Sequence, residues 1–388
     1  MNYRTNKING DELSALGFGC MRFPKDEKET ENLILYSIEK GVNYFDTAFM
    51  YGNSEAVLGR ILNKNNKRGQ VKIATKIPPA LIKKHSDFDK YFERQLKRLQ
   101  TDYIDYYLIH MLTDVSVWNR LVGLGAKTWI DGKKAEGSIK NIGFSFHGGK
   151  DEFINICDAY EWEFCLIQYN YLDENNQAGI TGLRHAAGKG MPVIIMEPLR
   201  GGMLANKLPK NAAQAFEGAQ VKRSPAEWAF RWLLNQPEVT CVLSGMNNMK
   251  MLEENINTAA NTNPGEFTEE DLLVISNAKQ AITDAIKVPC TGCGYCMPCP
   301  QGVDIPTCLS CYNDTAIEKR FTALSAYIMQ TSFKSNPQFA SLCNKCGECE
   351  GLCPQKIEIR RELQNTKNAF EKFYFKPFVA LAKWYMKL

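Results

Sequence analysis

The sequence lacks several features that would place it in a common class of protein. It has no uncharged apolar run of about eighteen residues or more, which a membrane-spanning helix requires. Its opening residues, MNYRTNKINGDELSALG, include no apolar stretch like that of a secretion signal. The net charge is only +4 over 388 residues, which gives no reason to expect a nucleic-acid partner. We therefore expect a cytoplasmic protein without a transmembrane segment.

Cysteine, by contrast, is abundant, and eight of the fourteen cysteines fall into two short runs near the C-terminus. The first run consists of Cys290, Cys293, Cys296 and Cys299, followed by Pro300. The second consists of Cys343, Cys346, Cys349 and Cys353, followed by Pro354. Three cysteines at two-residue spacing can surround one face of a cubane, and a fourth before proline typically ligates the other cluster of a two-cluster ferredoxin. The runs therefore predict two [4Fe–4S] clusters.

Structural zinc sites and disulfides are the two alternative uses of these cysteines. Zinc is commonly held by four ligands in two pairs, whereas each run supplies three closely spaced thiols and a fourth. Disulfides need an oxidising compartment, and the sequence shows no signal that would send the chain to one. Both alternatives are therefore less favoured than iron–sulfur clusters.

The position of the prolines predicts that each run gives its last cysteine to the other cluster. One cluster would then be held by Cys290, Cys293, Cys296 and Cys353, and the other by Cys343, Cys346, Cys349 and Cys299. The first run departs from the bacterial ferredoxin spacing, because two residues rather than three separate Cys296 from Cys299. Cys308 and Cys311 are close enough to substitute for Cys299. The remaining cysteines lie in apolar surroundings and are predicted to be core residues: Cys20, Cys157, Cys165 and Cys241.

The first 285 residues alternate between short apolar, β-branched runs and helical patterns, which is typical of βαβ units. The predicted strands are 15–20, 42–46, 71–75, 104–110, 139–145, 164–169, 192–197 and 239–244. The predicted helices between them include 29–40, 88–99, 151–160, 179–189, 225–235 and 249–259. Eight such repeats indicate an α/β fold, a (β/α)8 TIM barrel. An open doubly wound sheet is the alternative, but no Gly-x-Gly-x-x-Gly turn follows the first strand.

The rest of the chain completes a two-domain prediction. Residues 3–13, with Asn9-Gly10 in the middle, predict a hairpin over the barrel floor. We expect the barrel to occupy residues 1–285 and a mostly helical, ferredoxin-like domain to occupy 286–388, with a helix near 316–329. The last segment, 370–388, is aromatic, basic and amphipathic. It is expected to fold back over the protein, to lie on a membrane surface or to dock a redox partner.

Polar residues occur at the C-terminal ends of the predicted strands, where barrels of this kind carry their catalytic residues. Asp46 ends the second strand, Lys76 follows the third, His110 ends the fourth, and Tyr51 lies just beyond Asp46. Around them the sequence resembles the aldo-keto reductase superfamily. The matching segments are Phe45-Asp46-Thr47-Ala48-x-x-Tyr51-Gly52-x-Ser54-Glu55, Ala74-Thr75-Lys76, Leu108-Ile109-His110, Ile142-Gly143-Phe144-Ser145 and Gln168-Tyr169-Asn170.

The resemblance implies transfer of a hydride from a nicotinamide to a carbonyl carbon, with Tyr51 supplying the proton to oxygen. A free phenol has a pKa of about 10, and an ammonium beside it, from Lys76, is expected to lower that pKa. Asp46 would hold Lys76 charged and oriented, and His110 would hydrogen-bond the substrate carbonyl. His147, in the loop after the fifth strand, is a further candidate for substrate contact.

The resemblance also implies a dinucleotide, NAD(H) or NADP(H), lying across the barrel mouth. Its predicted contacts are Ser145, Gln168, Met196, Gly245, Asn247, Lys250, Glu254 and Asn255. The sequence departs from the family pattern at three positions. Met251 stands where many NADPH-preferring members have an arginine, Met196 replaces the aromatic that stacks on nicotinamide, and Phe146 replaces an asparagine.

The combination of barrel and cysteine runs resembles a subgroup of the superfamily with a C-terminal dicluster domain. We therefore expect a carbonyl reductase with an appended electron-transfer module, acting on a small-molecule carbonyl substrate. Nicotinamides exchange two electrons at once and each cluster takes one, so a redox partner such as a ferredoxin or flavoprotein is expected. The alternative is an iron–sulfur electron carrier, or subunit of a redox complex, whose barrel is mainly a docking scaffold.

Overall fold

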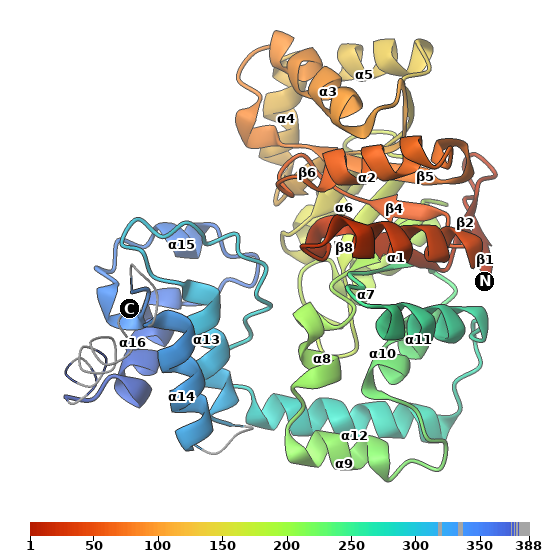
Figure 1. The fold of residues 1–388 in the computed structure, drawn as a ribbon. Coiled ribbons are helices and arrows are strands. Elements are labelled where there is room, and N and C mark those ends of the chain that lie inside the picture. Colours follow the sequence, from red (N-terminus) through yellow and green to blue (C-terminus); the bar gives the residue numbers. More distant parts are fainter. Residues whose placement is uncertain (317–319, 333–336, 374, 376, 378, 380–388) are drawn as a thin grey trace. The chain divides into compact units, whose positions relative to one another are not determined.

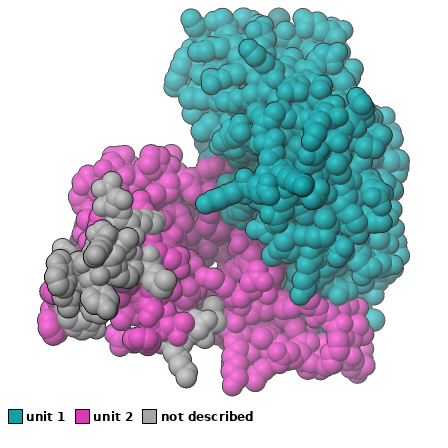
Figure 2. Space-filling model, in the orientation of Figure 1, with its two compact units in different colours: residues 1–198, 226–268 teal, residues 199–225, 269–388 magenta. Residues whose placement is uncertain are grey.

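The chain divides into two compact units. The structure, a computed structural model, describes residues 1–316, 320–332 and 337–373, together with residues 375, 377 and 379. One unit comprises residues 1–198 and 226–268, and the other comprises 199–225 and 269–388 (Figure 2). This division differs from the expected boundary after residue 285. The reason is that α9 (Lys210–Glu217) and α12 (Glu269–Ala285) pack against each other, which draws both segments into the second unit.

The first unit contains a closed barrel of eight parallel strands, as the sequence predicted (Figure 1). The strands follow chain order around the barrel, and the last one, β10, pairs with the first, β3, to close it. Their bounds are β3 Leu16–Gly19, β4 Tyr44–Asp46, β5 Lys72–Ile77, β6 Ile104–Leu112, β7 Ile139–Phe146, β8 Phe164–Gln168, β9 Val193–Met196 and β10 Val239–Ser244. The alternative of an open doubly wound sheet is excluded, because these strands close into a barrel and leave no free edge.

Apolar side chains from different strands fill the barrel interior. Tyr106 on β6 belongs to this apolar cluster, with ring centroids 5.3 Å from Tyr44 on β4 and 4.9 Å from Phe164 on β8, both edge to face. Smaller residues from β5, β9 and β10 complete the same cluster. Edge-to-face pairs are a favoured aromatic geometry, so this packing fixes the strands against one another. The predicted core cysteines, Cys20, Cys157, Cys165 and Cys241, are all buried.

Helices follow the strands as the sequence patterns predicted. Their bounds are α1 Glu27–Glu39, α2 Ser54–Lys64, α3 Ser86–Leu99, α4 Val115–Gly123, α5 Ala126–Ala135, α6 Lys150–Asp158, α7 Gly179–Gly188, α10 Pro225–Leu234 and α11 Met249–Ala260. Local capping explains several starts: the Asp26 side chain accepts from the Lys28 amide at α1, and Asn248 accepts from Met251 at α11. Pro225 occupies the first position of α10, where its missing N–H costs nothing.

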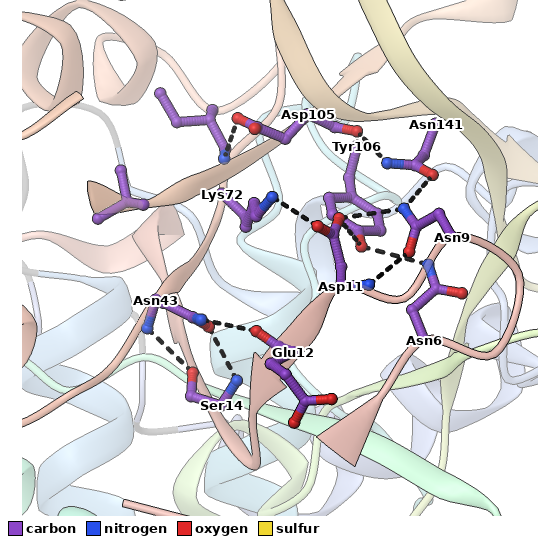
Figure 3. A network of polar contacts seen from close by, with 12 residues as sticks. Asn6, Asn9, Asp11, Glu12, Ser14, Asn43, Lys72, Asp105, Tyr106 and Asn141 are labelled. Atoms are coloured by element: carbon purple, nitrogen blue, oxygen red, sulfur yellow. Dashed lines mark hydrogen bonds and ion pairs between the residues drawn. The ribbon is translucent and has the colours of Figure 1, made fainter. Parts of the chain in front are cut away.

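The predicted hairpin is present as β1 (Tyr3–Thr5) and β2 (Glu12–Ser14), which pair antiparallel. Polar side chains tie its loop to the N-terminal ends of the barrel strands (Figure 3). Asp11 receives hydrogen bonds from Lys72 Nζ at 2.7 Å and from the Tyr106 hydroxyl at 2.8 Å. Asn9 donates to Asn141 at 2.8 Å. This end of the barrel is therefore closed by a network whose members satisfy one another.

The second unit is helical around the cysteine runs. It contains η4 (Arg200–Gly202), α8 (Met203–Asn206), α9, α12, α13 (Ile305–Asp314), α14 (Arg320–Thr331), η5 (Ala340–Leu342), α15 (Glu348–Gly351) and α16 (Ile359–Phe370). The helix expected near 316–329 corresponds to α14, and residues 317–319 of that prediction lie outside the described residues. One apolar core joins α13, α14 and α16 with the segments that carry the cysteines.

The beginning of the amphipathic C-terminal segment packs within this unit. Phe370 stacks on Tyr327 with ring centroids 4.6 Å apart, and Phe375 lies 5.9 Å from the same ring. Both phenylalanines are buried. Most of the predicted segment beyond Phe375 lies outside the described residues. In the described part of the chain, we find no helix with the length and apolar character that crossing a membrane would require.

Gly59 provides a test of how closely α2 and α3 pack. A Cβ at Gly59 would lie 2.5 Å from the backbone oxygen of Arg98 at the end of α3. We expect Gly59→Ala to lower the free energy of unfolding by about 1–3 kcal/mol, because rigid backbone must move, despite the better helix propensity of alanine. Denaturant unfolding followed by circular dichroism measures the change.

The matched control is Gly123→Ala at the end of α4, where no atom lies within 4 Å of the added methyl group. This variant should be as stable as the parent or slightly more stable. Equal unfolding midpoints for the two alanine variants would contradict the close approach.

Candidate active site and cluster sites

The four predicted catalytic residues lie at the same end of the barrel. Asp46 is the last residue of β4, Lys76 is near the end of β5, and His110 is near the end of β6. Tyr51 lies in the loop between β4 and α2. Because all eight strands are parallel, their C-terminal ends share one mouth, which is where barrel enzymes carry their chemistry.

Lys76 and Asp46 form a buried ion pair at this mouth. Lys76 Nζ donates to Asp46 Oδ1 at 2.6 Å and to the backbone oxygen of Thr47 at 2.7 Å. Lys76 is fully buried and Asp46 is 4% exposed. Burial raises the pKa of Asp46, while the ammonium of Lys76 opposes that change. Two buried charges at this distance hold one another, so removing either partner would leave the other uncompensated.

Tyr51 lies against both of the other functional groups. The Lys76 ammonium is 4.9 Å from the centroid of its ring, and the rings of Tyr51 and His110 meet edge to face at 5.9 Å. Burial raises the pKa of Tyr51, and the carboxylate of Asp46 raises it further. This differs from the sequence-based expectation that Lys76 lowers the pKa. The physical reason is that desolvation of the phenol dominates, and the negative charges of Asp46 and Glu197 add to its effect. The hydroxyl is therefore protonated near neutral pH.

His110 is neutral in this environment. It is 3% exposed, and burial holds its pKa well below the ordinary value, with Lys76 and His147 lowering it further. A neutral imidazole carries one N–H, which can donate a hydrogen bond to a carbonyl oxygen. His147 follows β7 and is 4% exposed, and burial lowers its pKa to about 4. His147, the candidate for substrate contact, is therefore close enough to His110 to influence its pKa.

A buried polar network behind Lys76 was not predicted as such from the sequence. Thr75 Oγ1 and Gln95 Nε2 both donate to Glu55 Oε1, at 2.7 and 2.8 Å. Gln95 also donates to the backbone oxygen of Lys76 at 3.1 Å, and Arg98 pairs with Glu55 at 3.0 Å. Glu55 belongs to the recognised motif, but Gln95 and Arg98 lie on α3 outside it. Their contacts fix β5 and so position the Lys76 side chain.

Hydroxyl groups also hold the turn that carries Tyr51. Thr47 Oγ1 and Ser54 Oγ are 2.8 Å apart, and Ser54 Oγ donates to the backbone oxygen of Cys20 at 2.8 Å. Both Thr47 and Ser54 are buried. This pairing joins the end of β4 to the start of α2, and the chain between them places the phenol over the barrel mouth.

The residues predicted to contact a dinucleotide lie at the ends of the last four strands and on the segment after β10. Ser145 Oγ accepts from the Met111 amide at 2.8 Å, and Gln168 Nε2 donates to Asp173 at 3.1 Å. Met196 ends β9 and is partly exposed. Asn255, buried on α11, donates to Ser244 Oγ at 3.1 Å. The others, Gly245, Asn247, Lys250 and Glu254, belong to the loop after β10 and to α11.

The cysteine runs of the second unit line two cavities. We call the first cluster site the group Cys290, Cys293, Cys296 and Cys353, which line one cavity. We call the second cluster site the group Cys299, Cys343, Cys346 and Cys349, which line the other, with Cys296 also on its wall. Each cavity thus receives three thiols from one run and one from the other. This grouping is the exchange of last cysteines that the prolines suggested. A cubane in each cavity stays a prediction.

Within each cluster site, the thiols also raise one another's pKa values. Burial raises the pKa of Cys296 to about 12, and the thiols of Cys290, Cys293 and Cys353 raise it further. Burial likewise raises the pKa of Cys349 to about 11, with Glu350, Cys343 and Cys299 contributing. A raised pKa keeps these thiols protonated, and an iron–sulfur cluster would supply the cationic centre that lets them ligate as thiolates.

Cys308 and Cys311, the suggested substitutes for Cys299, line neither cavity. Both are buried on α13 within the apolar core of the second unit. None of the fourteen cysteines, all of which lie within the described residues, forms a disulfide.

The fold and the site together define a barrel oxidoreductase that carries iron–sulfur sites. A family model described as the Aldo/keto reductase family matches residues 15–270, and one described as a 4Fe-4S dicluster domain matches residues 289–358. The chain therefore belongs to the aldo/keto reductase family and carries a 4Fe–4S dicluster domain. This confirms the predicted family and subgroup, and the dicluster domain supports iron–sulfur clusters over zinc and disulfides.

Individual relatives agree with this membership. The chain is 27% identical over 311 residues to a probable aldo-keto reductase from Glycine max, covering 69% of this chain and 86% of that protein. It is 22% identical over 299 residues to yakc of Schizosaccharomyces pombe, named as an NADP(+) aldo-keto reductase, covering 66% and 86%. The holo form of aldo-keto reductase AKR11C1 from Bacillus halodurans has the same fold, with a TM-score of 0.61 at 23% identity, covering 72% of this chain and 96% of that one.

Paired cysteine substitutions test the two ligand groups. Cys290→Ser/Cys353→Ser removes two thiols of the first cluster site and should retain about half of the parent iron and acid-labile sulfide. Cys349→Ser/Cys353→Ser removes one thiol from each site and should retain almost none. Iron and sulfide are determined on anaerobically purified protein.

Cys311→Ser serves as the control and should keep the full iron content, because Cys311 lines neither cavity. If the first double variant lost both clusters and the second lost only one, the grouping would be wrong.

Proposed function

We propose that this protein reduces a small carbonyl compound to an alcohol with NADH or NADPH. The observation that carries the proposal is the group of Tyr51, His110 and the buried Lys76–Asp46 pair at one barrel mouth. A protonated phenol and a neutral imidazole are both hydrogen-bond donors, and a carbonyl oxygen accepts two hydrogen bonds. The site is therefore suited to bind a carbonyl oxygen and to supply a proton to it.

In this proposal each residue has a defined role. The nicotinamide, when bound, supplies the hydride that bonds to the carbonyl carbon. Tyr51 gives its hydroxyl proton to the carbonyl oxygen as the C=O π bond breaks, so the product is an alcohol. His110 donates a hydrogen bond that orients the carbonyl. Lys76, held by Asp46, stabilises the phenolate that remains on Tyr51 until a proton from solvent replaces the one transferred.

The dinucleotide is proposed to lie along the ends of β7 to β10. The N-terminus of α11 suits its phosphates, because the first amides of a helix point outward and favour anions. Lys250, in the first turn of α11, adds a positive charge. An NADP(+) designation for a relative supports NADP(H), while Met251 in place of an arginine supports NAD(H). The proposal therefore includes both dinucleotides.

The dicluster domain is proposed to hold two [4Fe–4S] clusters that exchange single electrons with a partner such as a ferredoxin or a flavoprotein. A hydride carries two electrons, whereas each cluster takes one, so a carrier able to handle both is required. A reducing compartment keeps the cysteines from forming disulfides and so leaves them able to ligate clusters, which supports a location in the cytoplasm.

Tyr51→Phe tests the proposed reduction. Loss of the transferable proton should lower kcat/KM for an aldehyde by at least about 100-fold, the range typical of general acid catalysis. Initial rates are measured anaerobically with NADH and with NADPH, using the best substrate of the parent from a panel of aliphatic and aromatic aldehydes. Iron content should equal that of the parent.

Tyr103→Phe is the matched control, since it also loses one phenolic hydroxyl. Tyr103 lies just before β6, at the opposite end of the barrel from His110. Its variant should retain parent activity. Parent-like turnover by Tyr51→Phe would refute the role given to Tyr51.

A further inference from the structure

Arg200 connects the segment after β9 to the first cluster site. It begins η4, four residues beyond Met196 along the chain. The side chain is almost entirely withdrawn from solvent, with 3% exposed. Its Nη2 donates to the backbone oxygen of Pro289 at 2.9 Å, and Pro289 directly precedes Cys290. A buried guanidinium is thus held beside the first ligand of that site.

The backbone at Arg200 is unusual in a way that supports a specific role. Arg200 has φ of 46°, a left-handed conformation that costs energy for any residue except glycine. Gly201 and Gly202 follow, also with positive φ. This turn aims the side chain toward Pro289. Such strain tends to persist where the surrounding structure needs the geometry.

Arg200 places a positive charge next to the backbone of Pro289, one residue before Cys290. A guanidinium stays protonated at all relevant pH values, so its positive charge is permanent. In a buried setting a charge is weakly screened, so its influence on neighbouring negative charge is large.

The second cluster site has a different electrostatic setting. Arg360 lines its cavity, but its side chain is 49% exposed and pairs with Glu350 at 2.6 Å. Cys346 of the same site is exposed. A cation that is half exposed and already paired exerts a weaker field than a buried one. The two sites therefore differ in local charge although their ligands are the same.

We propose that Arg200 is a positioning and charge-supplying residue that raises the reduction potential of the first cluster site above that of the second. Reduction adds negative charge to a cluster, and net charge, hydrogen bonds and solvent exposure set its potential. A buried cation beside Cys290 favours the reduced state and makes the first site the better electron acceptor. The inference rests on the two clusters of the proposed function, but it concerns residues outside the catalytic group.

The test is a redox titration of anaerobically purified protein with dithionite and mediators, followed by electron paramagnetic resonance. No dinucleotide or carbonyl compound is present. The single variants Cys353→Ser and Cys299→Ser assign each reduction step to a site. In Arg200→Gln, the ratio of reduced to oxidised first site at a fixed potential should fall about tenfold, which is 59 mV for a one-electron couple. The step of the second site should not change.

Two further variants separate charge from structure. Arg200→Lys keeps the charge and should stay within about threefold of the parent ratio. Lys207→Gln is the matched control, because Lys207 also bridges this segment to the dicluster domain, through Asp314 at 3.1 Å, and Asp314 is on α13 away from the cluster ligands. Its titration should match the parent.

Three outcomes would overturn the proposal. They are an unchanged first step in Arg200→Gln, an equal shift of both steps, and a shift in Arg200→Lys as large as that in Arg200→Gln. If Arg200→Gln loses the first cluster, the test is the comparison of the Arg200→Lys titration with that of the parent. No nicotinamide enters the redox titration. A negative result for Arg200 would therefore not contradict carbonyl reduction, and failure of the Tyr51→Phe prediction would not contradict the role of Arg200.

Discussion

The ion pair between Lys76 and Asp46 is the interaction on which the proposed chemistry depends. Both groups are buried, so each has lost its hydration and requires the other at 2.6 Å. Neighbouring parallel strands supply the two partners, and the closed barrel keeps water away from them. The pair lets an ammonium stand beside the Tyr51 ring without an uncompensated buried charge. The network of Glu55, Gln95 and Thr75 holds β5, and with it the lysine, in place.

Much of the fold and of the site could be predicted from the sequence, because the relevant signals are local. Short β-branched runs marked all eight barrel strands to within a few residues. The motif from Phe45 to Glu55 predicted that Tyr51 lies beside Asp46, because both residues belong to the same short segment. The interval between cysteines, and the proline after each run, gave two groups of thiols that line separate cavities in the structure.

Other properties depend on contacts between distant segments, which no local pattern encodes. The rise in the pKa of Tyr51 comes from burial, and burial emerges only when the barrel is assembled. Gln95 and Arg98 are ordinary helix residues in the sequence, and only the packing of α3 on the barrel turns them toward Glu55. The grouping of 199–225 with the dicluster domain arises from α9 on α12 and from Arg200 at Pro289, which are far apart in the chain.

Carbonyl reduction requires the barrel to bind a nicotinamide, whereas a barrel that is only a scaffold for an electron carrier does not. The most direct measurement is an anaerobic titration of the iron-loaded protein with NADH and NADPH, following nicotinamide fluorescence and the visible absorbance of the clusters together. We expect saturable binding of at least one dinucleotide at the barrel mouth. Absence of binding by both dinucleotides, with no bleaching of the clusters, would contradict it and favour the electron carrier.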